Sequence, residues 1–261
     1  MKINLKNKKA LVGGSTQGLG KAIALQLAKC GAEVTLMARN KDKLKKVKSE
    51  LNIDNNQNHK ILVVDFTDFA SYKNIITNYF KLNTVDILVN NTNGPKGGNV
   101  FEKNIDEYQQ AFDLLFKSVV FTTMLAVDNM KKKNFGRIIN ATSLTVKEPL
   151  EHLVLSNSIR AAVTTWAKTL SNNVAANGIT VNNILTGLFD TERIKELNDL
   201  QAKSKGVTSE AVLKSLTDSV PMKRLGKPEE FGYLVSFLAS EYASYITGTN
   251  LPIDGGLIKS L

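Results

Sequence analysis

The stretch from residue 9 to residue 40, KALVGGSTQGLGKAIALQLAKCGAEVTLMARN, decides the fold. A short apolar run ends in a glycine-rich turn, a segment of helical period follows, and a second short apolar run comes next. Two buried strands joined by a helix form a parallel pair, because parallel strands need a long crossover connection. The stretch therefore predicts a strand, a helix and a second, parallel strand.

The same alternation continues to the end of the chain. Helical segments, the longest at about 104–131 and about 154–176, separate the apolar runs. This order predicts an α/β fold: a doubly wound parallel sheet of about seven strands with helices on both faces. Ligands of such sheets bind at the carboxyl ends of the strands. The runs suited to strands are KKALVGG (8–14), EVTLMA (33–38), KILVVD (60–65), VDILVN (85–90), GRIINAT (136–142), ITVNNIL (179–185) and TNLPID (249–254).

Length and composition favour one domain over residues 1–261. A chain of 261 residues with 43% hydrophobic content can bury one substantial core. The segment at about 188–226 is polar and irregular, and within it the residues from about 192 to 220 alternate polar and apolar side chains. We interpret this segment as a lid over the substrate.

Cysteine usage, charge and hydropathy limit the class of protein. The single cysteine, Cys30, gives neither a disulfide framework nor metal-type spacing, so we expect no metal and a cytoplasmic location. The lysines behind the net charge of +10 are scattered, which indicates a solvated surface and no nucleic-acid partner. The N-terminal apolar run is too short for a secretory signal. No segment approaches the roughly 18 apolar residues of a membrane span, so we also expect no membrane partner.

The glycine-rich turn predicts a phosphate-binding site. Its glycines allow the backbone to turn sharply and approach a bulky anion, which the amides at the start of the next helix can bind. A glycine-rich turn without a ligand is the alternative. The residues of this predicted cofactor site are Gly14, Ser15, Thr16, Gly18, Leu19 and Gly20.

The spacing of these glycines resembles that of the short-chain dehydrogenase/reductase family, and the resemblance extends over nearly the whole chain. It implies a Rossmann-type fold and hydride transfer between a nicotinamide cofactor and a ketone or alcohol. Further segments that follow the family's order are DILVNNTNG (86–94), GRIINATS (136–143), GITVNNILTGLFDT (178–191), KRLGKPEEFGYLVSFLAS (223–240) and YITGTNLPIDGG (245–256).

The resemblance assigns further cofactor contacts. Asp65 and Phe66 stand where the family contacts adenine, and Asn91 stands next to the adenosine ribose. Asp65 also suits a turn or cap, and Asn91 also suits a hydrogen bond at the end of the sheet. After the second strand Ala38 occupies the family's usual acidic position and Arg39 follows, which favours NADP(H) because arginine attracts the 2′-phosphate. A solvated surface arginine is the alternative.

The loop after the sixth strand, LTGLFDTER (185–193), resembles the family's Pro-Gly-x-x-x-Thr. The resemblance implies that Gly187 and Leu188 pass along the nicotinamide and that Thr191 reaches its carboxamide or the pyrophosphate. Thr191 is equally suited to cap a following helix.

The resemblance breaks at the catalytic residues. The family places a serine after strand five and a Tyr-x-x-x-Lys motif thirteen residues later. Here Ser143 matches the serine, while Ser156 and Arg160 occupy the tyrosine and lysine positions, and Leu115 falls where the family has an asparagine. Divergent family members with Ser-Asn-x-x-Arg at this helix are described as similar to 3-oxoacyl-carrier-protein reductases.

The substitutions change what the site can do. An aliphatic hydroxyl such as that of Ser156 is a poor general acid, and Arg160 stays protonated, so it can hold ribose hydroxyls or stabilise an alkoxide but not donate the proton. Water ordered by Ser143 and Ser156 is one proton source. The loss of one acid costs about 10²- to 10⁴-fold in rate. A helix that lost its catalytic pair is the alternative.

Two other groups on the loop before this helix can act on a substrate. His152 has an ordinary pKa of about 6.5, and Glu148 lies in the same loop, although both also suit solvated surface. His59 lies before the third strand, far from the predicted site, and we assign it no role.

Together the residues predict an NADP(H)-dependent carbonyl reductase or alcohol dehydrogenase whose substrate is a ketone, an alcohol or an acyl thioester. A catalytically silent NADP-binding protein that acts through its lid or through partners is the alternative. The family commonly forms tetramers through helices that correspond to about 104–131 and 154–176, and the broad apolar faces of both predict a homo-oligomer, tetramer or dimer.

Overall fold

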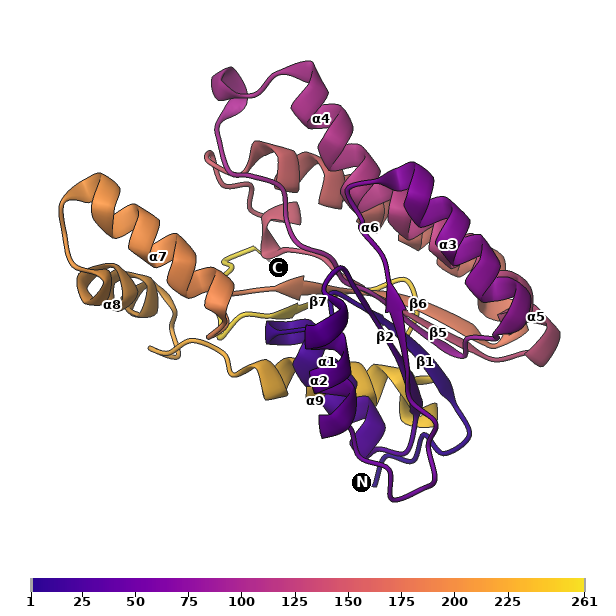
Figure 1. The fold of residues 1–261 in the computed structure, drawn as a ribbon. Coiled ribbons are helices and arrows are strands. Elements are labelled where there is room, and N and C mark those ends of the chain that lie inside the picture. The colour runs from indigo at the N-terminus through magenta and orange to yellow at the C-terminus, as the bar shows by residue number, and fades with distance from the viewer. Residues whose placement is uncertain (1, 261) are drawn as a thin grey trace.

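The computed structural model describes residues 2–260, within which seven strands form one sheet. The strand order is β3-β2-β1-β4-β5-β6-β7, and every neighbouring pair is parallel (Figure 1). The predicted doubly wound parallel sheet is confirmed. The strands are β1 (Lys9–Gly13), β2 (Glu33–Ala38), β3 (Lys60–Val63), β4 (Ile87–Asn90), β5 (Gly136–Ala141), β6 (Ile179–Thr186) and β7 (Asn250–Ile253).

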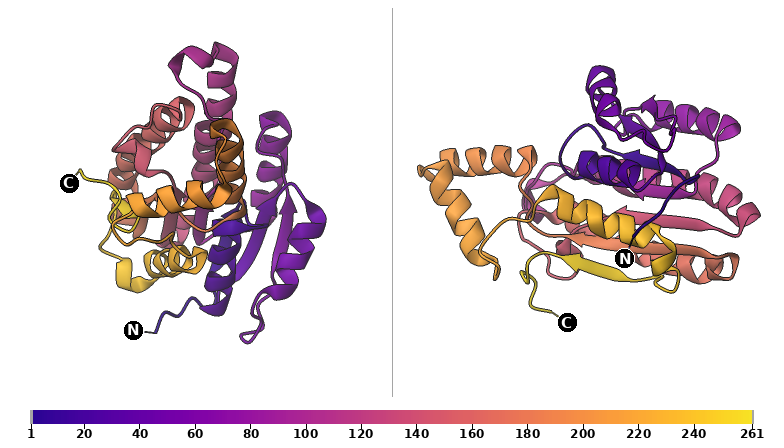
Figure 2. Two further views of the ribbon diagram at one scale, coloured as in Figure 1. Left: turned by 90° about the vertical axis from the view of Figure 1, so that its left-hand side faces the viewer. Right: turned by 90° about the horizontal axis from the view of Figure 1, so that it is seen from below.

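Helices cover both faces of the sheet, as Figures 1 and 2 show. Successive side chains of a strand point to opposite faces, so Ala10 and Val12 of β1 join one core and Leu11 joins the other. On the first face lie α1 (Gly18–Lys29), α2 (Lys41–Glu50) and α9 (Pro228–Ala239). On the second lie α3 (Phe69–Leu82), α5 (Ser118–Lys133) and α6 (Val154–Val174). Short helical turns complete the chain: η1 (Val100–Glu102), η3 (Leu144–Val146), η4 (Ala175–Asn177) and η5 (Glu241–Ala243).

One continuous helix spans Ile105–Lys133. It consists of α4 (Ile105–Phe112), a π-helical turn η2 (Asp113–Lys117) and α5. It contains an 18-residue window of mean hydropathy 1.4 and is by length and composition apolar enough to cross a membrane. The prediction that no segment approaches this limit was therefore wrong. In the fold, the helix packs along the sheet between α3 and α6.

The segment after β6 is more regular than predicted. It holds two helices, α7 (Glu192–Lys205) and α8 (Ser209–Ser219), which project from the body of the molecule (Figure 2). Each begins at a threonine whose hydroxyl accepts a backbone hydrogen bond, Thr191 from Ile194 and Thr208 from Ala211. These caps satisfy amides that would otherwise lack partners, so polar residues form helices here.

Candidate active site

The carboxyl ends of β1 and β4 lie side by side at the point where the strand order reverses. The glycine-rich turn follows β1, and Asn91 follows β4. The Asn91 side chain donates from Nδ2 to the Gly13 carbonyl at 3.0 Å. The expected hydrogen bond at the sheet end is thereby confirmed, and it holds the two loops together.

The glycine turn approaches its surroundings closely. Gly14 has a left-handed φ of 57°, and a Cβ on Gly20 would lie 2.2 Å from the Gly14 carbonyl oxygen, so neither position accepts a larger residue. Within the described residues no side chain caps the amides that open α1. Free amides at a helix N-terminus beside a narrow glycine turn fit a phosphate group.

The side chains of two turn residues serve the fold. The Ser15 hydroxyl is buried and accepts a hydrogen bond from the Met37 amide at 2.9 Å, which ties the turn to β2. Leu19 packs against the core under α1. Only their backbones are therefore available to a ligand, which narrows the role predicted for both. Thr16 lies half-buried in the same turn.

The loop after β6 meets the glycine turn. A Cβ on Gly18 would lie 3.4 Å from the Thr191 methyl group. The Thr191 oxygen accepts from the Ile194 amide, so the helix-cap alternative is confirmed, while its own proton remains free to donate. Gly187 donates to the Ile253 carbonyl at 3.1 Å. Leu188 lines a second cavity of about 330 Å³ beside Met222 and the end of β7.

Arg39 follows the end of β2, and Asp65 follows the end of the neighbouring strand β3. The Arg39 side chain is 60% exposed, and its Nη1 lies 3.9 Å from Oδ2 of Asp65. The other Asp65 oxygen accepts from the Thr67 amide and hydroxyl at 2.9 and 2.7 Å, which confirms its expected turn role. Partial burial raises the pKa of Asp65, but the Thr67 hydrogen bonds and Arg39 together leave this pKa below its usual value. The Phe66 ring packs against Tyr72.

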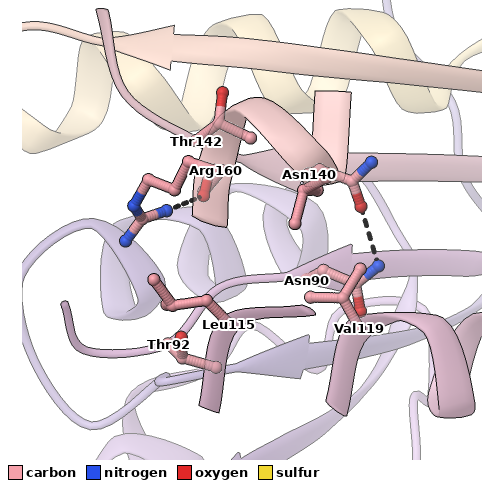
Figure 3. Close-up of a pocket in the computed structure, with 9 residues that line it drawn as sticks. Asn90, Thr92, Leu115, Val119, Asn140, Thr142 and Arg160 are labelled. Atoms are coloured by element: carbon pink, nitrogen blue, oxygen red, sulfur yellow. Dashed lines mark hydrogen bonds between the residues drawn. The ribbon is translucent and has the colours of Figure 1, made fainter. Parts of the chain in front are cut away.

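A small cavity lies between the ends of β4 and β5 (Figure 3). Its volume of about 10 Å³ is close to the space that one water molecule needs. It brings Leu115 and Arg160 together, while Ser143 and Ser156 do not line it. The lining residues are Asn90, Thr92, Leu115, Val119, Asn140, Ala141, Thr142, Arg160 and Val163.

Arg160 is the one cation of this lining. Its Nη1 donates to the Ala141 carbonyl at 2.7 Å, and Figure 3 shows the rest of the guanidinium extending past that bond. Burial lowers the pKa of Arg160 to about 10, which still leaves it protonated at neutral pH. Among the ion pairs of residues 2–260, none includes this side chain.

The two serines lie at the same end of the sheet. The Ser143 hydroxyl accepts from the Thr145 amide at 3.2 Å and from the Thr145 hydroxyl at 3.0 Å, at the start of η3. Ser156 lies half-buried in the first turn of α6, which packs against η3. No hydrogen bond joins the Ser156 hydroxyl to another group in the described part of the chain.

Leu115 lies in the π-helical turn. Such turns widen a helix locally and are frequent at functional sites. No local pattern indicates this turn, because the apolar residues of 105–133 keep a helical period on both sides of it. The π-turn brings the buried Leu115 side chain to the cavity wall opposite Arg160.

A ladder of asparagines crosses four strands beneath the site, and sequence reasoning missed it. Each side chain donates from its Nδ2 to the next side-chain oxygen at 2.8 Å. The members pair in register across β4, β5, β6 and β7. An asparagine in each of these four apolar runs was the available signal. The members are Asn90, Asn140, Asn183 and Asn250.

The loop before α6 is fixed at both ends. The His152 carbonyl accepts from the Gly98 amide at 2.7 Å, while its imidazole belongs to an exposed residue. Glu148 accepts from the Lys259 and Ser260 amides at 2.6 and 2.7 Å, so it anchors the C-terminal segment. Neither residue lines the Arg160 cavity. His59 is buried, and its Nδ1 accepts from the Val34 amide, a structural role.

Known proteins resemble this chain over its whole length. A family model described as enoyl-(acyl carrier protein) reductase matches residues 14–258. The chain is 30% identical over 259 residues to the NADPH-dependent reductase BacG of Bacillus subtilis, covering 98% of this chain and 100% of that protein. It is 33% identical over 259 residues to the 3-oxoacyl-[acyl-carrier-protein] reductase FabG of Haemophilus influenzae, with coverage of 98% and 100%.

Solved structures agree with these relatives. The L-sorbose reductase of Gluconobacter frateurii, complexed with NADPH and L-sorbose, superposes with a TM-score of 0.93 at 30% identity, over 100% of both chains. YwfH, an NADPH-dependent reductase involved in bacilysin biosynthesis, superposes with a TM-score of 0.90 at 31% identity, over 97% of this chain and 99% of that chain.

Proposed function

This chain belongs to the short-chain dehydrogenase/reductase family, and from that premise we propose that it reduces a ketone with a proton delivered by water, beside Arg160. It is an NADP-dependent oxidoreductase. One observation carries the proposal: the uncapped start of α1, Asn91 and Thr191 converge on the narrow glycine turn, and the partly buried Arg160 guanidinium lies at the ends of β4 and β5.

The residues present fit the cofactor from end to end. The backbone of residues 14–20 would hold the pyrophosphate, with the Thr191 hydroxyl as a further donor. Arg39 would hold the 2′-phosphate, and Lys43 lies close by, with its Nζ 3.5 Å from Gln17 of the turn. Asp65, Phe66 and Asn91 would line the adenosine half, and Gly187 with Leu188 the nicotinamide half.

Bound NADPH supplies a hydride to the carbonyl carbon of the substrate. Arg160 stabilises the negative charge on the carbonyl oxygen, because a guanidinium in a low-dielectric site interacts strongly with an oxyanion. Ser143 and Ser156 orient a water molecule that gives its proton to this oxygen. Neither serine is acidic enough to replace a phenol, so turnover is slower than in relatives with tyrosine by about 10²- to 10⁴-fold.

The relatives named as 3-oxoacyl reductases support an acyl thioester or related ketone as substrate. Helices α7 and α8 form a lid that orders over it. We place the protein in the cytoplasm, where its single half-buried thiol of Cys30 stays reduced. The long helix 105–133 and α6 form the contacts of a homodimer or homotetramer.

The proposal is tested by NADPH consumption with a panel of 3-oxoacyl thioesters, diketones and other ketones, beside a fluorescence titration of NADPH binding. We expect micromolar NADPH binding and slow turnover of at least one panel member. Binding without turnover on every member would favour a silent NADP-binding protein. The reductase relatives support the enzymatic interpretation over that alternative.

A further inference from the structure

We propose that the substrate of this site carries a carboxylate that pairs with Arg160, so that the protein acts on a short oxo acid. This inference rests on the proposed function. It starts from the absence of any counter-charge for Arg160 among residues 2–260. Within residues 2–260 its side chain makes one hydrogen bond, to the neutral carbonyl of Ala141. The side chain is partly buried, and a partly desolvated charge without a counter-charge favours the binding of an anion.

The neighbours of Arg160 do not compensate its charge. The cavity lining is neutral apart from the guanidinium. Asn90 donates to Thr123 and to Asn140, and Asn140 donates to Asn183, so both side chains are neutral members of the ladder. The Thr142 hydroxyl donates to the Ile184 carbonyl. Because the lining holds no carboxylate, a ligand carboxylate is the partner that would balance the guanidinium charge.

The cofactor's own anionic groups lie elsewhere. The pyrophosphate site is the glycine turn after β1, and the 2′-phosphate site is Arg39 after β2. Arg160 lies at the ends of β4 and β5, where the nicotinamide half extends, and that half carries no negative charge beyond the pyrophosphate. The substrate therefore supplies the negative charge that pairs with Arg160.

The loop after β4 approaches Arg160 with a glycine. A Cβ on Gly94 would lie 4.0 Å from the Arg160 Nη2, so residue 94 places no side chain against that nitrogen. A planar guanidinium binds a carboxylate through two parallel hydrogen bonds, which a ketone oxygen cannot reproduce. The exposed lysines of the two flanking loops, Lys96 and Lys147, add positive charge that attracts anions to this entrance.

The spacing within α6 limits the length of the substrate. Ser156 and Arg160 are one helical turn apart, a rise of about 5–6 Å. A carboxylate on Arg160 leaves the carbonyl within reach of both Ser156 and the same guanidinium only when a few bonds separate the two groups, as in a 2-oxo or 3-oxo acid. The overall reaction converts the oxo acid, NADPH and one proton into the hydroxy acid and NADP⁺.

The experiment compares each oxo acid with its methyl ester in NADPH oxidation, for the natural protein and for Arg160→Met. We expect the natural protein to prefer the acid by about 10- to 100-fold in kcat/KM, the scale of a hydrogen bond to a charged group. Arg160→Met should remove that preference. Lys132→Met removes one exposed positive charge at the end of α5. This position lies at the amino-terminal ends of the strands, away from Arg160, so the variant should leave the preference unchanged.

A binding measurement makes the test independent of turnover. Propanoate and propanamide are titrated into the NADPH complex, and nicotinamide fluorescence is followed. We expect propanoate alone to bind to the natural protein and neither to bind to Arg160→Met, with the Kd for NADPH changed less than about threefold. Equal binding of acid and amide, or an Arg160→Met effect confined to NADPH affinity, would overturn the inference and assign Arg160 to the ribose. If the natural protein turns over no ketone but still binds propanoate, the proposed function is overturned and the anion site at Arg160 is not.

Discussion

Arginine and lysine act differently at position 160. A lysine is a compact point charge that can lower the pKa of a neighbouring phenol, whereas a guanidinium is a planar fork suited to two acceptor oxygens. In this chain the fork already holds the end of β5 through the Ala141 carbonyl. The replacement of tyrosine by Ser156 and of lysine by Arg160 thus removes a proton donor and adds a site for an anion.

The double variant Ser156→Tyr with Arg160→Lys tests the register of the site, that is, whether positions 156 and 160 correspond to the family's tyrosine and lysine. If position 156 faces the substrate carbonyl, the phenol restores a proton donor and raises kcat by about 10²-fold or more, because general acids contribute about 10²- to 10⁴-fold. The measurement is steady-state NADPH oxidation with the best neutral ketone. Ser158→Tyr, on an exposed position of the same helix, is the control. An equal response of both variants would contradict the register.

Cofactor choice depends on Arg39. The variant Arg39→Asp places a carboxylate where the 2′-phosphate would lie, so NADPH binding should weaken by about 100-fold or more while NADH binding changes little. The two Kd values are measured by fluorescence titration. An equal effect on the two cofactors would show that Arg39 is a solvated surface residue.

The asparagine ladder joins four strands of the sheet through side chains, in addition to the hydrogen bonds between their backbones. Its inner members are buried, so each amide depends on its neighbour for satisfaction. The ladder fixes the strand ends that carry Thr92 and Thr142 to the cavity. It thereby holds the site on a rigid frame.

The variant Asn140→Leu tests the ladder. It leaves the Asn183 side-chain oxygen and one Asn90 donor without partners, and unsatisfied buried groups cost about 1–3 kcal/mol each. We expect the free energy of unfolding in urea to fall by about 2–4 kcal/mol. Asn250→Leu at the exposed end should cost less than about 1 kcal/mol, because water can replace the lost acceptor. Equal losses for the two variants would contradict this account.

The contact between Glu148 and the C-terminal segment is pH-dependent. Hydrogen bonds from the Ser260 and then the Lys259 amide lower the pKa of Glu148. At a pH above the ordinary glutamate pKa of about 4.3, the ionised carboxylate stabilises the docked C-terminal segment. This stabilisation is lost as the pH falls through the lowered pKa of Glu148. The amide resonances of Lys259 and Ser260 should therefore shift below pH of about 4. Glu148→Gln should weaken docking at neutral pH, whereas Glu151→Gln should not.

At the scale of the whole molecule, the long helix 105–133 raises the question of what covers its outer side. One side packs on the sheet, but Met124 is 48% exposed and Phe112 is also exposed. Phe112 stacks on Phe116, which in turn contacts Trp166 of α6, so the two helices present one aromatic surface. A helix apolar on both sides is stable when a second copy covers it.

Met124→Glu tests the assembly. A charge at the centre of a helix interface is desolvated without a partner, so we expect the sedimentation coefficient to fall from that of a dimer or tetramer to that of a smaller species. Leu82→Glu is the matched control, since Leu82 is 88% exposed at the end of α3. A natural protein that sediments as a monomer would contradict the predicted homo-oligomer.

The sequence by itself determined the parallel sheet, its seven strands and the narrow glycine turn after the first strand. These follow from the period of apolar residues and from glycine, which are local properties of the chain. The segment at 188–226 is more regular than predicted, because threonine caps begin α7 and α8. The long helix at about 104–131 was predicted, but its apolar window of membrane-span length was not.

Only the tertiary structure decided how the site residues divide their work. Several polar side chains form hydrogen bonds with segments that are distant in sequence, namely those of Ser15, Glu148 and the four asparagines. No local sequence pattern predicts such partners. Arg160 is a second example. It has no counter-charge within residues 2–260, and this follows from the neutral residues that line its cavity. A residue's type is local information, whereas its pairing and burial depend on the whole fold.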